Sequence, residues 1–435
     1  MKTRYLLLAG ILGVLTTGTA GAQTVIYISG APAARQPVTT AINRLLTSST
    51  TNGLVSTAIS GTNTTTLITA NAVTWYGGNI NGTPVTVKLS YVGSSAGIQD
   101  VASQTTANFL PVSATASAVA YPEPNTSGNA HDAEIPNFTA SDEFQASTPW
   151  LGTNGLVGHS VTYQSLHSDV VGVLPYRWVS NVDAPATIKN ITPQQARLLF
   201  TSGWIYLSQL TGSNADENTG VYAIGRDIGS GLRTILLSET GIGVQTNIQQ
   251  YSPTVSKSGT TPYIASQVLY PAETVNGVAL GTGDGGYSSF SGLLADLSAY
   301  TNSNGGNLAG TANVSLPGYY VTGLADADAQ TAIAAGAHEI AWNGNYLGTL
   351  GTYGTGAGNT GSASYSLSEG SYTFWSYIQL QYLTSQLSNS VNPTPYAFEQ
   401  ALKTDLHNTD STVLLKDLNV SKNVDGGIIF GTNPY

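Results

Sequence analysis

The sequence predicts an α/β protein with a mostly parallel sheet. Strand-like runs alternate with runs of helical spacing along the chain, an alternation typical of strand–helix–strand units. Turns of glycine, serine and alanine join several of the strands to the helices that follow them. The chain has 435 residues, which is too long for one ordinary core, so we expect two domains.

The first strand–helix unit is expected close to the N-terminus. Residues 24–28 (Thr-Val-Ile-Tyr-Ile) predict a strand, and residues 29–32 a turn. Residues 37–46 have the apolar spacing of a helix. Pro37 suits the first helical turn, because its missing N–H would have no partner there.

Further units follow along the chain. Residues 84–92 and 169–179 predict strands, and residues 98–103 begin a helix. Residues 192–200 predict a short helix that a threonine caps, with proline at the first helical position. The threonine- and asparagine-rich residues 47–71 are more typical of an elaborated loop than of a core element.

The N-terminus predicts export. Lys2 and Arg4 precede an apolar run at residues 5–15, and Ala-Gly-Ala at residues 20–22 suits signal peptidase. We therefore expect residues 1–22 to be a signal peptide, and the mature protein to be periplasmic or extracellular. No later stretch reaches the ~20 apolar residues that a membrane-spanning helix needs, so no membrane insertion is expected.

Composition narrows the choice of partners. The sequence has no cysteine, 14 basic residues and 24 acidic residues. Removing Lys2 and Arg4 with the leader leaves 12 basic against 24 acidic residues, a formal charge of about −12. Nucleic acid is disfavoured, because no basic patch could neutralise its phosphates. The histidines are scattered without metal-ligand spacing, so neither a metal nor a cofactor is expected.

The segment that says most about function is Gly-Arg-Asp-Ile-Gly-Ser-Gly at residues 225–231. It follows a strand-like run at residues 221–224 and precedes a helix-compatible run at residues 232–239. Arg226 offers a fork of donors and Ser230 a hydroxyl, while the glycines let backbone N–H groups approach an oxyanion at the positive helix end. A plain strand–helix turn is the alternative interpretation.

Two other junctions have the same character. Residues 29–35 and residues 93–97 also put small residues and free N–H groups where a strand gives way to a helix. Because the carboxyl ends of parallel strands meet at one edge of a sheet, we expect all three junctions to face a shared cleft.

Together with Ala-Ser-Asp at residues 140–142, these motifs resemble the type 2 periplasmic solute-binding proteins, and in particular the phosphate-binding proteins of phosphate ABC transporters. The motifs occur in the family's order. The first loop matches residues 29–35, the glycine-serine turn residues 93–97, and the arginine loop residues 226–232. Weaker matches fall at residues 191–200, 318–321 and 372–377.

The resemblance implies a two-lobed, periplasmic-binding-protein-like fold in which each lobe is a mixed, mostly parallel sheet flanked by helices. The first lobe would comprise residues 23–173, completed by residues 368–435, and the second residues 174–367. Long polar insertions are expected, among them 302–311 and 350–366. The implied function is capture of phosphate or a related protonated oxyanion for uptake or sensing, without catalysis. An ABC transporter permease is the implied partner.

The resemblance also implies a set of ligand-binding residues. Arg226 would pair with the anion, while Ser94 and Ser230 would supply hydroxyls and Gly231 a backbone N–H. Asp142 would face the ligand, and a carboxylate repels an anion unless the anion has a proton to donate, as hydrogen phosphate does and sulfate does not. The candidate residues are Ala34, Arg35, Ser94, Ser95, Asp142, Arg226, Ser230 and Gly231.

The sequence departs from the family in the first loop and in the arginine loop. Leu232 stands where the family has a threonine, and Ala34 and Arg35 stand where it usually has threonine and phenylalanine. Two hydroxyl donors are lost and a second cation is gained. These departures favour oxyanion binding in general over phosphate in particular.

Two other functions stay open on the sequence. With 9% charged residues and long polar loops, the chain also suits an extracellular structural or adhesive protein that has kept the fold and lost the site. A secreted serine hydrolase is the other alternative, because Gly93-x-Ser95-x-Gly97 matches a nucleophile elbow. Its triad partners would be Asp405 with His407, or Asp169 with His338.

For two segments the sequence also allows a structural role in place of a ligand-binding one. Asp142 could cap a helix that starts near Phe144 instead of facing a ligand. The aromatic run at residues 372–377 predicts core packing in a strand that links the two lobes.

Overall fold

The computed structural model describes residues 23–48, 56–61, 65–114, 120–150, 163–275, 278–302, 316–348, 364–388, 391–409 and 413–431. The predicted signal peptide lies outside these ranges, as do nearly all of residues 302–311 and 350–366. Among the described residues, no helix is both long enough and apolar enough to cross a membrane.

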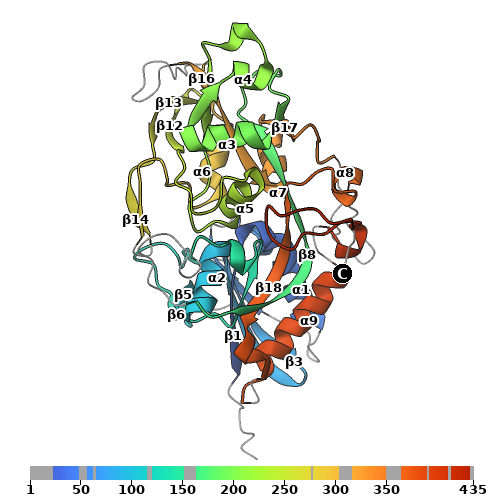
Figure 1. Cartoon of the computed structure of the whole chain (residues 1–435). Coiled ribbons are helices and arrows are strands. Elements are labelled where there is room, and N and C mark those ends of the chain that lie inside the picture. Colours follow the sequence, from blue (N-terminus) through green and yellow to red (C-terminus); the bar gives the residue numbers. More distant parts are fainter. Residues whose placement is uncertain are drawn as a thin grey trace, which may run out of the picture.

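The molecule is elongated, and its helices and strands gather in two groups (Figure 1). The long strands β8 (Leu166–Ser180) and β18 (Trp375–Leu383) run between the groups. The first group, the lower one in Figure 1, comes from the N-terminal part of the chain and from one late helix. It contains β1 (Thr24–Gly30), α1 (Arg35–Ser48), β2 (Ser56–Ile59), β3 (Ala72–Ile80), β4 (Thr83–Ser90), α2 (Ser94–Ser103), β5 (Ala107–Phe109), β6 (Asp132–Glu134), β7 (Phe138–Ser141) and α9 (Thr394–Thr409).

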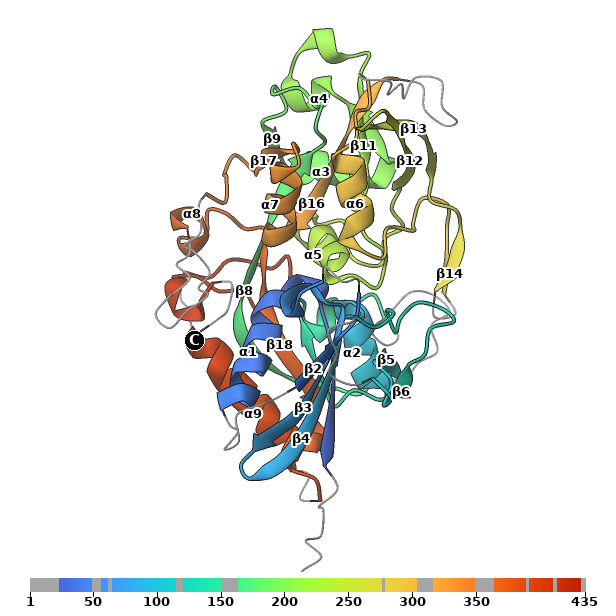
Figure 2. The ribbon, with the colours of Figure 1, turned by 180° about the vertical axis from the view of Figure 1, so that it is seen from behind.

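The second group comes from the middle of the chain, and Figure 2 shows it from behind above α1 and α2. It contains β9 (Asn190–Ile191), α3 (Pro193–Ser202), β10 (Trp204–Tyr206), α4 (Ser208–Thr211), β11 (Gly220–Ala223), α5 (Gly231–Thr240), β12 (Tyr251–Ser258), β13 (Thr261–Leu269), β14 (Glu273–Val275), β15 (Val278–Leu280), α6 (Phe290–Leu297), β16 (Gly318–Ala325), α7 (Asp326–Ala334) and β17 (His338–Trp342). The short α8 (Tyr365–Ser368) precedes β18. The predicted lobe boundaries at 173/174 and 367/368 stay a prediction.

One mixed sheet of 12 strands runs through both groups. Its main order is β10-β11-β16-β8-β18-β7-β1-β4-β3-β2, and β17 lies beside β8 and β9. The 15-residue strand β8 pairs with β18 through its first part and with β16 and β17 through its last residues. Strand β8 is therefore continuous from one group into the other.

The sheet has fewer parallel pairs than the sequence predicted. Strand β1 runs parallel to β4 and β7, and β11 runs parallel to β16, but most other neighbours are antiparallel. One cause is the two-residue turn between β3 and β4, where Asn81 (φ 49°) and Gly82 (φ 85°) adopt the left-handed conformation that a tight hairpin requires. The other is that β18 runs antiparallel to β8.

Several predicted elements are confirmed. Thr192 caps α3: the Gln195 backbone N–H donates to Thr192 Oγ1 (3.2 Å), and the Gln195 side chain accepts from the Thr192 N–H (2.8 Å). Helix α2 starts at Ser94, four residues earlier than predicted. Residues 47–71 are not all loop, because they include β2.

The aromatic run at residues 372–377 is core, as predicted. Phe374 and Trp375 are fully buried. Trp178 of β8 stacks on Phe374 with ring centroids 5.6 Å apart and on Trp342 with centroids 5.5 Å apart. This aromatic stack packs the second group against the start of β18.

The C-terminal residues 413–431 tie the two groups together. The Lys422 ammonium forms an ion pair with Glu239 of α5 and donates to the Trp375 carbonyl (2.9 Å). The Phe144 backbone N–H, from the first group, donates to Asp425 Oδ2 (2.8 Å). The segment therefore contacts both groups beside the two strands that join them.

Candidate functional site

The two candidate residues of the first predicted junction, Ala34 and Arg35, lie in different surroundings. Ala34 is fully buried in the hydrophobic core, at the end of a single 3₁₀ turn that follows β1. Arg35 begins α1 and is half-buried, with its guanidinium 5.4 Å from the ring centroid of Tyr91. Its Nη1 donates to the Thr69 carbonyl (3.2 Å) and its Nη2 to Asn71 Oδ1 (2.6 Å).

The second junction is buried. Gly93 has φ 113°, a conformation that favours glycine, and it lets α2 start directly after the turn that follows β4. Ser94 and Ser95 are both fully buried. Ser94 Oγ accepts from the Asp142 backbone N–H (2.8 Å), and Ser95 Oγ donates to Glu143 Oε1 (2.5 Å).

At the third junction, the guanidinium of Arg226 is held in place by hydrogen bonds to two backbone carbonyls. Its Nε donates to the Tyr287 carbonyl (2.8 Å) and its Nη2 to the Ser288 carbonyl (2.9 Å). Ser230 is the N-cap residue of α5, and its hydroxyl makes no capping bond. Both Arg226 and Ser230 are buried.

The second and third junctions meet, together with Asp142. A Cβ on Gly231 would lie 1.8 Å from Asp142 Oδ1 and 2.6 Å from Ser94 Cβ, so these residues are in direct contact. A Cβ on Gly93 would lie 2.4 Å from the Gly229 carbonyl oxygen. The reason is topological: Ser94 and Asp142 follow the carboxyl ends of β4 and β7, which flank β1 in parallel, while the arginine loop follows β11 in the facing group.

Between these junctions lies a small cavity of about 10 Å³, room for the centre of roughly one water molecule. We call it the inner cavity. Its lining includes Ser94, Asp142, Arg226, Ser230, Gly231 and Asp328. Five of the eight candidate residues therefore converge on one point. Ala34 and Ser95 lie away from it.

Asp142 is the least compensated polar group of the inner cavity. Tyr176 Oη donates to its Oδ2 (2.9 Å), while its buried Oδ1 has no hydrogen-bond partner among the described residues. Burial raises the pKa of Asp142, and its hydrogen bonds to Ser94 and Tyr176 and the charge of Arg226 oppose that rise. While Asp142 is ionised, this free oxygen can only accept a hydrogen bond, so it suits a ligand that carries a proton. The alternative in which Asp142 caps a helix is wrong, because the next helical turn starts at Gln145 with Phe144 as its N-cap.

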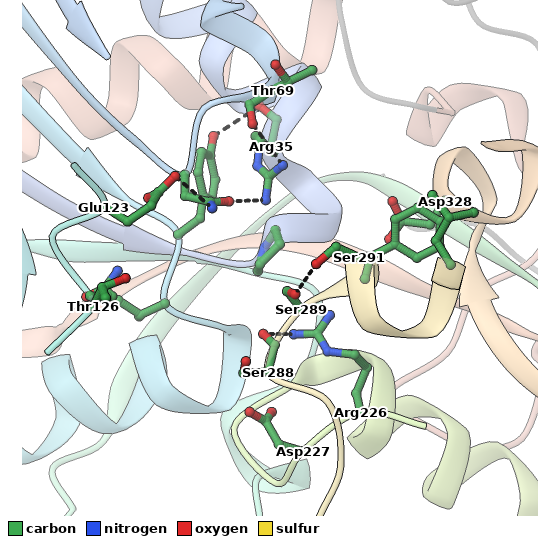
Figure 3. Close-up of a pocket in the computed structure, with 17 residues that line it drawn as sticks. Arg35, Thr69, Glu123, Thr126, Arg226, Asp227, Ser288, Ser289, Ser291 and Asp328 are labelled. Carbon is green, nitrogen blue, oxygen red and sulfur yellow. Dashed lines mark hydrogen bonds between the residues drawn. The ribbon is translucent and has the colours of Figure 1, made fainter. Parts of the chain in front are cut away.

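A larger pocket of about 650 Å³ adjoins the inner cavity. We call it the outer pocket. Arg226 and Asp328 line both spaces. Figure 3 shows Arg35 and Arg226 on opposite sides of the outer pocket, with Ser289 and Ser291 between them. Arg35 comes from the first group of elements and Arg226 from the second, so the pocket lies where the two groups face one another.

Neither arginine of the outer pocket forms an ion pair within the described part of the chain. By contrast, Arg44, Arg177 and Arg233 all pair with carboxylates there. The buried Nε of Arg35 has no hydrogen-bond partner among the described residues, and burial lowers the pKa of this guanidinium. Two cationic groups with only neutral oxygens as partners are a site for an anion.

Sequence reasoning missed Asp328, Glu123 and the serines at 288–291. Asp328 lies in the first turn of α7, directly after β16, and its charge is within electrostatic reach of both arginines. Burial raises its pKa to about 6. The acidic pair Asp326 and Asp328, shortly after the motif match at residues 318–321, was a signal that could have found it. The serines lie where a loop leads into α6, with Ser289 as the N-cap and Ser291 in the first turn, and no local pattern fixes the position of this junction in space.

The hydrolase alternative finds no support in the geometry of Ser95. Its buried hydroxyl is bonded to Glu143 and lies 3.2 Å from Thr234 Oγ1. The histidines proposed as triad members are engaged elsewhere: His407 Nε2 lies 2.6 Å from the Val170 carbonyl oxygen, and His338 Nε2 lies 3.1 Å from that of Val182. The described residues also contain no cluster of three or more side chains that could hold a metal ion.

No protein-family model matches the sequence, and no curated protein is similar to it at a significant level. Among solved structures, the chain is similar to proteins described as phosphate receptors or phosphate-binding proteins, which is the class that its motifs resemble.

One is an ABC-type phosphate transport receptor from Vibrio cholerae, 12% identical over 87% of this chain and 93% of that one, with a TM-score of 0.40. A second is a putative phosphate ABC transporter substrate-binding protein from Clostridium perfringens, described with bound phosphate (12% identity, 88% and 96% coverage, TM-score 0.39). A third is a phosphate-binding protein from Stenotrophomonas maltophilia (13% identity, 94% and 88% coverage, TM-score 0.35).

Proposed function

We propose that the protein is an exported solute-binding protein that captures phosphate or a related protonated oxyanion between its two groups of elements. The observation that carries this proposal is the pair of guanidinium groups, Arg35 and Arg226, that line one pocket without a carboxylate partner in the described residues. Within the described residues each guanidinium is hydrogen-bonded only to neutral oxygens, so each can still donate to an anion. An anion at Arg226 would take charge-assisted hydrogen bonds from that guanidinium, and the positive charge of Arg35 across the outer pocket would add electrostatic attraction.

The anion is placed by the donors around Arg226. Ser94 and Gly231 start helices α2 and α5, and Ser230 occupies the N-cap position of α5 with its hydroxyl free of any capping bond, so two positive helix ends lie beside the guanidinium. An oxyanion at this point takes charge-assisted hydrogen bonds from Arg226 and from the Ser230 hydroxyl. The inner cavity of about 10 Å³ is smaller than a tetrahedral oxyanion, so binding requires a small separation of the two groups. Strands β8 and β18, which join the groups, are the natural hinge.

Asp142 sets the choice of anion. Its unpartnered Oδ1 contacts the Gly231 backbone at the edge of the inner cavity. A ligand that carries a proton, such as hydrogen phosphate or hydrogen arsenate, donates to this oxygen, whereas sulfate brings only acceptors. We infer a preference for protonated oxyanions on this basis.

The cellular role follows from the predicted signal peptide. A protein that leaves the cytoplasm and holds a small anion without a covalent step suits delivery to an ABC transporter permease, or to a sensor. The acidic chain, at −10 overall, gives little long-range steering of anions, so capture depends on the local donors of the site.

The test is calorimetric titration of the purified mature protein with phosphate, arsenate, sulfate and molybdate. We expect phosphate and arsenate to bind, and Arg226→Ala to weaken that binding at least about 30-fold, because two charge-assisted hydrogen bonds contribute ~2 kcal/mol or more. Arg197→Ala is the matched control, since Arg197 is exposed on α3. It should leave the affinity unchanged.

Two results would contradict the proposal. Unchanged phosphate affinity in Arg226→Ala would mean that the anion binds elsewhere. Silence from all four anions, together with ordered assemblies in electron micrographs, would favour the structural or adhesive alternative.

A further inference from the structure

The outer pocket is far larger than an inorganic oxyanion needs. Its volume is about 650 Å³, within the range of ~300–1,000 Å³ that is typical of sites for organic ligands. It shares Arg226 and Asp328 with the inner cavity, so a ligand anchored at Arg226 has direct access to it. A lone phosphate at Arg226 would leave the side that carries Arg35 and Glu123 without contact to the ligand.

The outer pocket also offers more acceptors than an anion can use. Glu123 lies on the same side as Arg35, and Asp328 and Asp227 lie toward the second group (Figure 3). Ionised carboxylates only accept hydrogen bonds, so they match ligand hydroxyls and oppose a bare anion. Glu123 accepts from the Asn71 side chain (3.2 Å), which in turn accepts from Arg35 (2.6 Å). This chain of bonds fixes an acceptor and a cation side by side.

The mixture of groups distinguishes this pocket from a plain anion site. The lining combines groups that can donate, Arg35 and the hydroxyls of Ser289 and Ser291, with the acceptor Glu123. A carbon skeleton that carries several hydroxyls satisfies both kinds of group, because each hydroxyl both donates and accepts.

We propose that the ligand is a phosphomonoester of a small polyhydroxylated compound, with its phosphoryl group at Arg226 and its hydroxyls between Glu123 and Arg35. This inference rests on the proposed function, because it uses the same anion-binding residues. In its singly protonated form the monoester carries one phosphoryl charge, which would face Arg226 and the helix ends. The monoester, in its singly protonated form, still has a proton to donate to Asp142.

The experiment compares inorganic phosphate, glycerol 3-phosphate, glucose 6-phosphate and glucose by calorimetry against the mature protein. At least one ester should bind about tenfold or more tightly than phosphate, and glucose alone should not bind. Glu123→Gln keeps the size and one acceptor oxygen of the side chain. It should weaken ester binding about tenfold and change phosphate affinity less than about twofold. Glu217→Gln, an exposed glutamate in the β10–β11 connection, is the control.

The outcomes separate this inference from the proposed function. If phosphate binds through Arg226 but neither ester binds more tightly, or if Glu123→Gln leaves ester affinity intact, the inference is overturned and the proposed function stands. If neither phosphate nor ester binds, or if glucose binds as well as its phosphate, the proposed function fails and the inference falls with it.

Discussion

Replacement of Gly231 by alanine tests whether the two groups of elements meet at the inner cavity. The new Cβ would lie 1.8 Å from Asp142 Oδ1, whereas ordinary van der Waals contact starts at 3.4 Å, so the two walls must separate by about 1.6 Å. Overpacking of this kind costs ~1–3 kcal/mol. Because the walls belong to different groups, we expect them to part rather than the protein to unfold. The Cβ would also stand beside Asp142 Oδ1, the oxygen proposed to accept the ligand's proton, so phosphate affinity should fall about 5- to 150-fold if ~1–3 kcal/mol is lost.

Hydrogen exchange supplies a readout that needs no ligand. The Asp142 backbone N–H donates to Ser94 Oγ (2.8 Å) in the contact that Gly231→Ala disturbs, so its exchange should accelerate. Alanine is also the better helix former at the start of α5, by ~0.5–1 kcal/mol. The higher helix propensity of alanine would therefore stabilise α5, so it cannot cause the faster exchange or the lower phosphate affinity.

Gly229→Ala is the matched control in the same loop. Its Cβ would meet Ala96 Cβ and Asp227 Oδ1 at 3.8 Å, which is ordinary contact, and its φ is not positive. We expect wild-type affinity and wild-type exchange from this variant. If Gly231→Ala behaves like Gly229→Ala in both measurements, the close contact between the two walls does not exist in solution.

Three other predictions concern charge. Lys422→Met should lower the free energy of unfolding by ~3–5 kcal/mol in urea titrations, because it leaves the buried Glu239 carboxylate unpaired; an unchanged midpoint would refute the ion pair. Burial raises the pKa of Asp296 to about 8, so its contribution to stability is present below about pH 4 and is lost as the pH rises through 8. Asp296→Asn should therefore flatten the fall in unfolding free energy between pH 5 and 8, and an equally steep fall would contradict this assignment. Asp142→Asn should weaken phosphate binding and narrow the preference for phosphate over sulfate in competition titrations, since an amide can donate to a fully ionised anion; an unchanged preference would remove Asp142 from the site.

Much of the site was predictable because it follows from strand ends. Ser94 and Arg226 each follow a predicted strand after a single glycine, and Asp142 closes the Ala-Ser-Asp motif at residues 140–142. Strands β4 and β7, both parallel to β1, bring Ser94 and Asp142 to one edge, whereas Arg226 comes from the facing group after β11. The alternation of strands and helices likewise predicted the α/β class. The predicted helix cap at Thr192 was confirmed because a capping box is a local interaction within four residues.

The parts that could not be predicted depend on distant contacts. The closure of the inner cavity depends on how Gly231 meets Asp142 across the two groups, which no local pattern records. Leu232, the departure from the family's threonine, is buried against the core and lines the inner cavity, so the lost hydroxyl is replaced by packing. The outer pocket joins Arg35 to serines at the start of α6 that lie more than 250 positions away in the sequence. The number of antiparallel strand pairs in the sheet depends on the length and direction of β8 and β18, which no local sequence pattern fixes.

The most direct test of the central claim is to locate the anion. Crystals of the mature protein grown with arsenate would give an anomalous signal at the arsenic atom. We predict one strong peak within hydrogen-bonding reach of the Arg226 guanidinium and the Ser230 hydroxyl, beside Asp142. A peak elsewhere in the molecule, or none at millimolar arsenate, would contradict the claim that these junctions form an oxyanion site.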